Sequence, residues 1–169
     1  MNRKEPRAPS RVNPLQTMPL ANLFIAACDL LQRRTGAQVT LGLPGESDSG
    51  VFVWPWRIAQ NPTEKNAPLH SHQPDTSGQE KTSYRDVHFL VIVRPALTPA
   101  GLALLDAAQC AIAQEPAICI GDESVLLLLD TPAISDLTQV FLAASLPLSI
   151  CLGVVARGVP DSPAAQASS

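Results

Sequence analysis

Apolar residues recur at helical spacing in two long stretches of the chain. The first stretch starts at Pro19, places apolar residues three and four positions apart, and closes at Gly36. The second follows Thr98 and Pro99, a capping residue and a proline suited to a first helical turn, and runs to about Glu115. Because this spacing puts the apolar residues on one side of a helix, both stretches predict amphipathic helices that pack on a core.

Strand patterns lie between these two helices. Residues 38–43 alternate and lead through the turn-rich PGESDSG into VFVWPWRIAQNP at 51–62, which predicts a hairpin of two strands. Pro55 interrupts the second strand, and because proline has no backbone N–H, it predicts an edge position or a bulge there. Residues 84–94, YRDVHFLVIVR, begin with alternation and end as a continuous apolar run, which predicts a central strand covered on both faces.

Two further apolar stretches follow the second helix. Residues 125–130, VLLLLD, are flanked by turn residues and predict a short buried strand. Residues 140–156 carry no charge over nearly the length of a membrane span, which needs about 20 apolar residues. Pro147 divides them, so we instead predict a short helix capped by Ser135 and a closing strand at 148–157.

These elements predict one α/β (α+β) domain. Their order is helix, strand, strand, strand, helix, strand, helix, strand, which gives a mixed sheet of about five strands with three helices packed on it. Residues 19–158 form this single domain, and the polar stretch at 63–83 is expected to be a loop insertion on its surface. A basic, proline-rich arm at 1–18 and a tail at 159–169 are expected to be flexible.

The low charge changes this picture. Only 16% of the 169 residues are charged and 46% are hydrophobic, whereas an average soluble domain has roughly 25% charged residues. Part of the apolar surface is therefore expected to be covered by partners, as in a homo-oligomer. The net charge of −3 provides no positive field for phosphate backbones, which argues against nucleic acid as the main partner.

The cysteines and the N-terminus indicate assembly in the cytoplasm. The N-terminus lacks the apolar stretch of a secretory signal, so we expect no export through the general pathway. The cysteines lie far apart without a CxxC pair, which predicts small core residues with free thiols rather than zinc or redox chemistry. They are Cys28, Cys110, Cys119 and Cys151.

Motifs for catalysis or cofactor binding are absent from the sequence. It has neither the glycine-rich loops that hold phosphates nor the GxSxG turn of serine hydrolases. His70 and His72, with His88 or Asp75, could face one metal ion, but their spacing matches no metal motif and solvated loop histidines are favoured. Asp86 and His88 point the same way from a predicted strand, which suits a catalytic pair or the solvated beginning of that strand, and we favour the latter. We therefore predict no enzyme, no cofactor and no metal site.

Two groups of residues are candidates for contacts with protein partners. Trp54 and Trp56 share one side of their strand beside Arg57, and tryptophan is common in interface hot spots. The alternative, that the rings are core residues or lie beneath a helix, is favoured. The second group is the basic arm, which either docks on an acidic neighbour or stays solvated. Its basic residues are Arg3, Lys4, Arg7 and Arg11.

Three stretches of the chain carry the pattern of a known family. They are FVWPWRIAQNP, which runs into an Asn-Pro pair; YRDVHFLVIV, which follows a variable insertion; and LLDAAQCAIAQEPAI through VLLLLDTPAISDLTQVFLAASLPLSICLGVVARGV. Together they cover most of residues 20–158 and resemble the tail-terminator, or cap, proteins of phage-tail-like contractile injection systems. The chain departs from that family at Phe141, where a Trp is common, and after Pro147, where an aromatic residue is usual.

The resemblance implies a structural role in assembly. Family members form a ring, typically sixfold, that sits on the last layers of the inner tube and contractile sheath and stops their growth. The resemblance thus implies a homohexamer whose partners are the sheath and tube proteins of the same particle, and no catalytic residues come with that role. The particle would be assembled in the cytoplasm and then either released or anchored to a membrane.

Two other functions stay open. One is a small α/β enzyme or ligand-binding domain with a pocket near Asp86 and His88. The other is a membrane-associated protein that uses residues 140–156, which is the less favoured interpretation of that stretch.

Overall fold

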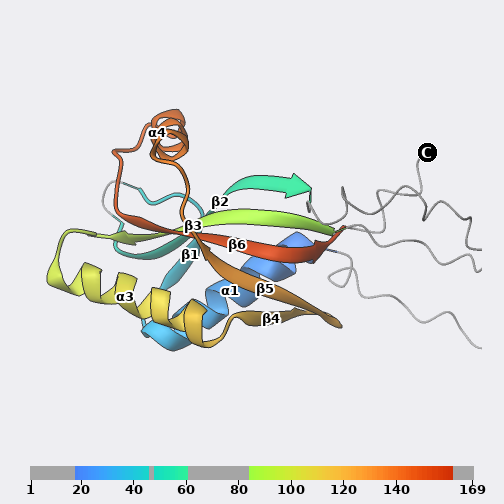
Figure 1. Ribbon diagram of the computed structural model, residues 1–169. Helices are drawn as coiled ribbons and strands as arrows, with labels where there is room; N and C mark the ends of the chain where they lie inside the picture. Colours follow the sequence, from blue (N-terminus) through green and yellow to red (C-terminus); the bar gives the residue numbers. More distant parts are fainter. Residues whose placement is uncertain (1–17, 46–47, 61–83, 162–169) are drawn as a thin grey trace, which may run out of the picture.

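A six-stranded sheet runs through the part of the chain that the computed structural model describes, residues 18–45, 48–60 and 84–161. Residues 1–17 of the predicted arm, the insertion at 63–83 and residues 162–169 of the predicted tail lie outside these residues. The first two residues of that predicted tail, Val159 and Pro160, instead end the last strand, and Val159 is buried. The strand order is β1-β2-β3-β6-β5-β4 (Figure 1). The strands are β1 (Val39–Leu41), β2 (Gly50–Gln60), β3 (Tyr84–Arg94), β4 (Ala117–Ile120), β5 (Glu123–Asp130) and β6 (Cys151–Pro160).

The sheet is mixed and the α+β class is confirmed, but two local connections differ from the prediction. β1 pairs with β2 in parallel, with Val39 beside Val51, so the predicted hairpin between them is wrong. The turn-rich residues between the two strands return the chain to the side of the sheet where β1 begins, so that β2 begins beside β1 and runs in the same direction. In addition, β4 pairs antiparallel with β5 and adds a sixth strand to the sheet.

β2 is an edge strand over its second half. β1 pairs only with Val51–Val53, so the outer side of residues 54–60 has no strand beside it among the described residues. β3 pairs with the inner side along the whole strand, with a register shift between Pro55 and Arg57. Pro55 thus marks both an edge and a bulge, as its missing N–H predicted.

Two long helices cover one face of the sheet (Figure 1). α1 (Pro19–Thr35) begins at its proline and ends at Gly36, which takes the left-handed conformation with φ 68°. α3 (Pro99–Gln114) is capped by Thr98, whose Oγ1 accepts a hydrogen bond from the N–H of Gly101 at 3.0 Å. Both helices start where the sequence predicted.

The main core lies between these two helices and the sheet. It takes buried residues from α1, α3 and every strand except β1. β3 crosses the middle of the sheet, as predicted, and its Phe89 is 1% exposed. The ring of Phe89 meets that of Phe24 on α1 edge-on, with centroids 5.8 Å apart. This contact ties the first helix to the central strand.

α4 (Ile134–Ala143) lies on the opposite face of the sheet and covers a smaller core (Figure 1). Its N-cap is Ala133, and no side chain caps it, so the predicted cap by Ser135 is wrong. Ser135 lies inside the first turn, where its hydroxyl contacts Asp136. Asp136 also lies in the first turn. Its negative charge interacts favourably with the positive end of the helix dipole and so stabilises the start of α4 without a side-chain cap.

The uncharged stretch at 140–156 divides between α4 and β6, as predicted. Pro147 lies in the connection, and β6 occupies residues 151–160 rather than the expected 148–157. Among the described residues, every helix is too short or too polar to cross a membrane.

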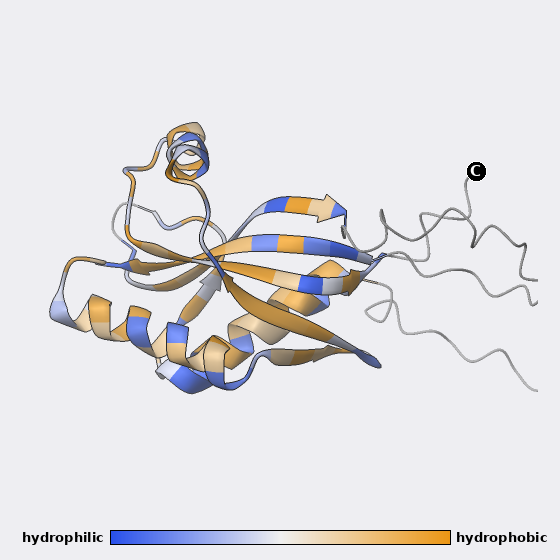
Figure 2. Cartoon of the chain, viewed as in Figure 1, coloured by the Kyte–Doolittle hydropathy of each residue, from blue (hydrophilic) through white to orange (hydrophobic). Residues whose placement is uncertain are grey.

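β5 is covered on one face only. Val125 and Leu127 belong to the main core and are 0% and 2% exposed. Leu126, which alternates with them, is 42% exposed, and the core under α4 contains no residue of β5. The predicted buried strand is therefore half open, although its central residues, Val125 to Leu129, are all hydrophobic (Figure 2).

Candidate functional site

Exposed apolar side chains lie along α4 and the connection that follows it. Ile134 and Leu142 are 72% and 74% exposed on the helix. Leu148 and Ile150 are 51% and 47% exposed in the connection. We call these four residues the α4 surface. Three of the four lie within residues 140–156, which carry no charge. Exposed apolar side chains that gather in one segment are typical of a protein-contact site.

Phe141 anchors the α4 surface to the sheet. Its side chain is 1% exposed and is the buried residue of α4. Its ring meets Trp54 edge-on, with centroids 5.6 Å apart. The helix is thus held from its inner side while its outer side stays open.

The tryptophans that the sequence singled out lie beneath α4. Trp54 and Trp56 are partly buried and pack against the small core. The sequence analysis favoured such a position, in the core or beneath a helix, over an exposed interface hot spot. Arg57 is exposed beside the bulge. An interface role for these three residues stays a prediction.

Asp86 and His88 have separate partners. Asp86 is 6% exposed, and its Oδ2 lies 3.8 Å from Nε of Arg157 on β6. His88 is half-buried, and its Nδ1 lies 3.1 Å from Oδ2 of Asp130 on β5. The ring of Trp56 covers His88 edge-on, with centroids 5.9 Å apart. The prediction that both residues are solvated is therefore wrong, because neighbouring side chains enclose them and supply a charged partner to each.

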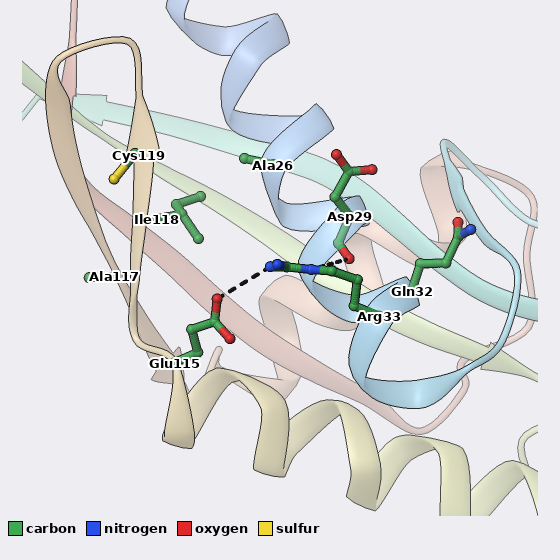
Figure 3. Close-up of a pocket in the computed structure, with 8 residues that line it drawn as sticks. All are labelled: Ala26, Asp29, Gln32, Arg33, Glu115, Ala117, Ile118 and Cys119. Atoms are coloured by element: carbon green, nitrogen blue, oxygen red, sulfur yellow. Dashed lines mark hydrogen bonds and ion pairs between the residues drawn. The ribbon is translucent and has the colours of Figure 1, made fainter.

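A cavity of about 430 Å³ lies between α1 and β4, and neither Asp86 nor His88 lines it (Figure 3). Glu115, which precedes β4, closes one end. Its carboxylate accepts from Nη2 of Arg33 at 3.3 Å and from Nη2 of Arg34 at 2.8 Å. The hydrogen bond from Arg34 is the main reason why the pKa of Glu115 is lowered. The cavity is therefore a different place from the predicted pocket near Asp86 and His88.

The four cysteines are free thiols, as predicted. Burial, together with the charge of Asp29, raises the pKa of Cys28 to about 11, and burial raises the pKa of Cys151. Cys110 and Cys119 are exposed, so their predicted core position is wrong. Cys119 alternates with buried residues along β4, which turns its side chain to the open face of the sheet.

Two sets of predicted candidates lie outside the described residues. One is the possible metal group of His70, His72 and Asp75. Within the segments that are described, no three His, Cys, Asp or Glu side chains group closely enough to hold a metal ion. The other set is the basic arm, with Arg3, Lys4, Arg7 and Arg11.

Comparison with known proteins gives matches in structure but not in sequence. The sequence matches no family model and no curated protein. One similar structure is the sheath/tube terminator of PVC, an extracellular contractile injection system, in its extended state, with a TM-score of 0.61 at 13% identity. Another is the anti-feeding prophage cap, a tube-terminating cap, with a TM-score of 0.62 at 12% identity. The chain shares its fold with these terminators.

The likeness to the tail-terminator family that the sequence suggested is thus confirmed in the fold. Each match covers 85% of this chain. The chain in turn spans 56% of the PVC terminator and 55% of the anti-feeding prophage cap. Nearly half of each terminator therefore lies outside the match.

Sequence reasoning missed β4 and the cavity beside it. The signal was present in Ala117–Ile120, where exposed Ala117 and Cys119 alternate with buried Ile118 and Ile120. Gly121, with φ 63°, then makes the tight turn into β5. A four-residue alternation directly after a helix is short, and the stronger apolar run of β5 masked it.

Proposed function

We propose that the chain terminates the inner tube and contractile sheath of a phage-tail-like contractile injection particle. The observation that carries this proposal is the shared fold, which extends over 85% of the chain in both a sheath/tube terminator and a tube-terminating cap. In this role the chain covers the last layer of subunits and stops further addition. The role needs shape and contact surfaces, not catalysis.

The form that we propose for this terminator is a ring of six copies. A closed ring needs head-to-tail contacts, in which one surface of each copy meets a different surface of the next. The α4 surface offers an apolar patch for such a contact. The low charge of the chain, 16%, supports the same conclusion, because charged residues are depleted at the centre of protein interfaces.

The partners follow from this role. They are further copies of the chain and the tube and sheath subunits of the same particle, with neither nucleic acid nor a membrane as a main partner. Assembly takes place in the cytoplasm, and the finished particle is then released or anchored to a membrane.

The test is to assemble tubes and sheaths with and without the chain. With it, electron microscopy should show particles of uniform length that carry extra density at one end. Without it, tubes and sheaths should vary in length. Light scattering on the purified chain should give a ring-sized mass, alone or with tube subunits present. A monomer that ignores both proteins would contradict the proposal.

A matched pair of substitutions connects this test to the α4 surface. Leu142→Asp places a charge on the exposed apolar side of α4, where Leu142 is 74% exposed. Gln139→Asp adds the same charge at an exposed polar position of the same helix. We expect Leu142→Asp to abolish ring formation or length control and Gln139→Asp to preserve both, while both variants remain folded. Equal behaviour of the two variants would remove the α4 surface from the ring contact.

A further inference from the structure

The two edges of the sheet differ in how they are protected from added strands. Along the outer side of β2, Pro55 lacks an N–H, a bulge interrupts the register and Arg57 is exposed. These features discourage pairing with another chain. β4, the other edge, has no proline, charge or bulge within Ala117–Ile120. β1 (Val39–Leu41), which forms the rest of the first edge, is only three residues long. The β4 edge therefore lacks the protection that the second half of β2 has, and it is the longer of the two unprotected edge strands among the described residues.

The outward-facing main-chain groups of β4 belong to Ala117 and Cys119. The N–H of Leu127 donates to the carbonyl of Pro116 across the β4–β5 hairpin at 2.6 Å. Along an antiparallel pair, residues that hydrogen-bond to the partner strand alternate with residues that do not. Pro116 is bonded to β5, so the next residue of this strand that is bonded to β5 is Ile118, opposite Val125. Ala117 and Cys119 lie at the positions between, and their N–H and C=O groups point away from β5 to the free edge.

α1 lies beside this edge and makes it one wall of a groove. The cavity of about 430 Å³ is lined on one side by Ala117, Ile118 and Cys119. On the other side it is lined by α1, including Ala26 and Asp29. Figure 3 shows Ile118 between the hairpin and α1, with Ala26 facing it from the helix. Gln32, Arg33 and Glu115 line the other end, where Arg33 reaches across to Glu115. The apolar part of the lining is therefore confined to the end at Ala26 and Ile118, which suits one small aliphatic side chain.

One charge at the groove has no partner in the part of the chain that is described. The carboxylate of Glu115 is held by Arg33 and Arg34. The main-chain carbonyl of Asp29 accepts from Nε of Arg33, but its carboxylate makes no ion pair or hydrogen bond within residues 18–45, 48–60 and 84–161. A cation on a bound segment would find its partner at Asp29.

We propose that the groove between α1 and β4 binds an extended segment of a partner polypeptide, which adds a strand to β4. The main chain of the segment bonds to Ala117 and Cys119, an aliphatic side chain rests on Ile118 and Ala26, and a Lys or Arg faces Asp29. In strand addition, the main-chain bonds give affinity and the alternate side chains give specificity. The proposal is independent of the terminator role, since the chain alone should bind such a segment.

The experiment titrates the full ¹⁵N-labelled chain with an N-acetylated, C-amidated peptide of sequence Thr-Val-Lys-Val-Thr. The amide signals of Ala117 and Cys119 should shift, and those along the outer side of β2 should stay. A peptide with Glu in place of Lys should bind more weakly, and Asp29→Lys should reverse that preference. Unmoved Ala117 and Cys119 signals at millimolar peptide would overturn the proposal.

A matched pair at Cys119 tests the main-chain bonds. Cys119→Pro removes an N–H that points to the free edge and leaves the ladder to β5 intact. Cys119→Ala changes the side chain and keeps the N–H. We expect about fivefold weaker binding for Cys119→Pro than for Cys119→Ala, the contribution of roughly one hydrogen bond. Equal binding would overturn the proposal.

A peptide with N-methylated main-chain nitrogens tests the same main-chain bonds on the unaltered chain. Undiminished binding of that peptide would also overturn the proposal.

Discussion

The two faces of the sheet are built on different scales. α1 and α3 cover one face, with a core that takes buried residues from both helices and from five strands. α4 covers part of the other face, over a core of few residues. The buried members of this second core are Phe52, Leu90, Ile92 and Phe141. Beyond α4, the second face carries the contact of Asp86 with Arg157 and that of His88 with Asp130.

This difference separates the residues that fold the chain from those available for contact. Hydrophobic stabilisation grows with the apolar area removed from water, at roughly 25 cal/mol per Å², so the face under α1 and α3 supplies most of it. α4 is attached through Phe141 and leaves Leu142 open. A segment with few buried contacts can move or be covered without unfolding the domain, which suits a surface that meets partner subunits.

Phe89→Ala tests the face under α1 and α3, which carries the larger core and which we call the larger face. It should have the largest effect. Phe89 is 1% exposed and contacts Phe24, and removal of such a ring leaves a cavity between the sheet and α1. We expect the free energy of unfolding in urea to fall by about 4 kcal/mol. Leu97→Ala, at a residue that is 81% exposed, should change it by less than about 0.5 kcal/mol. Similar losses for both variants would break the comparison.

Phe141→Ala tests the smaller face. Phe141 is as buried as Phe89, but the few residues around it can collapse into the space, so we expect a loss of about 3 kcal/mol or less. Hydrogen exchange should show faster exchange in α4 and unchanged protection in β3. Leu142→Ala, on the exposed side of the helix, is the control and should leave both patterns as they are. Faster exchange throughout the sheet would show that the two faces fold as one unit.

The larger face could be predicted because its signals are local. Helical spacing, the Pro19 and Thr98 starts and the apolar run of β3 each act within one element. The misread features depend on neighbours that are distant in sequence. The parallel pairing of β1 with β2 depends on register, and the burial of Asp86 depends on Arg157 from β6. No pattern within one strand contains that information.

The candidate contact sites were predictable in part. The uncharged stretch at 140–156 drew attention to α4, but periodicity alone did not show that Phe141 faces inward while Leu142 faces solvent. Pro55 correctly predicted an edge or a bulge. The open edge at β4 escaped notice because its strand is four residues long, and the groove beside it depends on how α1 packs against that strand.

Thiol labelling sharpens the contrast between covered and open positions. Burial raises the pKa of Cys28 to about 11 and also raises that of Cys151, so little thiolate forms near neutral pH. Cys110 and Cys119 are exposed. Mass spectrometry after brief iodoacetamide treatment at about pH 7.5 should therefore show these two labelled first. Labelling of Cys28 at the same rate would mean that α1 unfolds locally with a low free energy. The larger face would then be less stable than its packing indicates.

The smallest effect is expected at the rim of the larger face, where Glu115 joins α1 to the start of β4. The hydrogen bond from Arg34 lowers the folded pKa of Glu115 below its unfolded value of about 4.3. Stability from this pair is therefore present above the unfolded pKa and is lost as the pH falls through the lowered folded pKa. The effect is small because the pair is exposed to solvent, with Arg34 and Glu115 side chains 45% and 35% accessible.

Glu115→Gln should accordingly be slightly less stable than the unaltered chain at about pH 7, and the two should converge toward about pH 3. Thermal unfolding across that range measures the difference. Glu123→Gln, at an exposed carboxylate without an ion pair among the described residues, is the matched control and should give a smaller and flatter difference. A Glu115→Gln difference that stays constant down to the lowest pH would show that the glutamine loses packing or hydrogen-bond geometry rather than charge. The join between α1 and β4 would then depend on shape, as the rest of the larger face does.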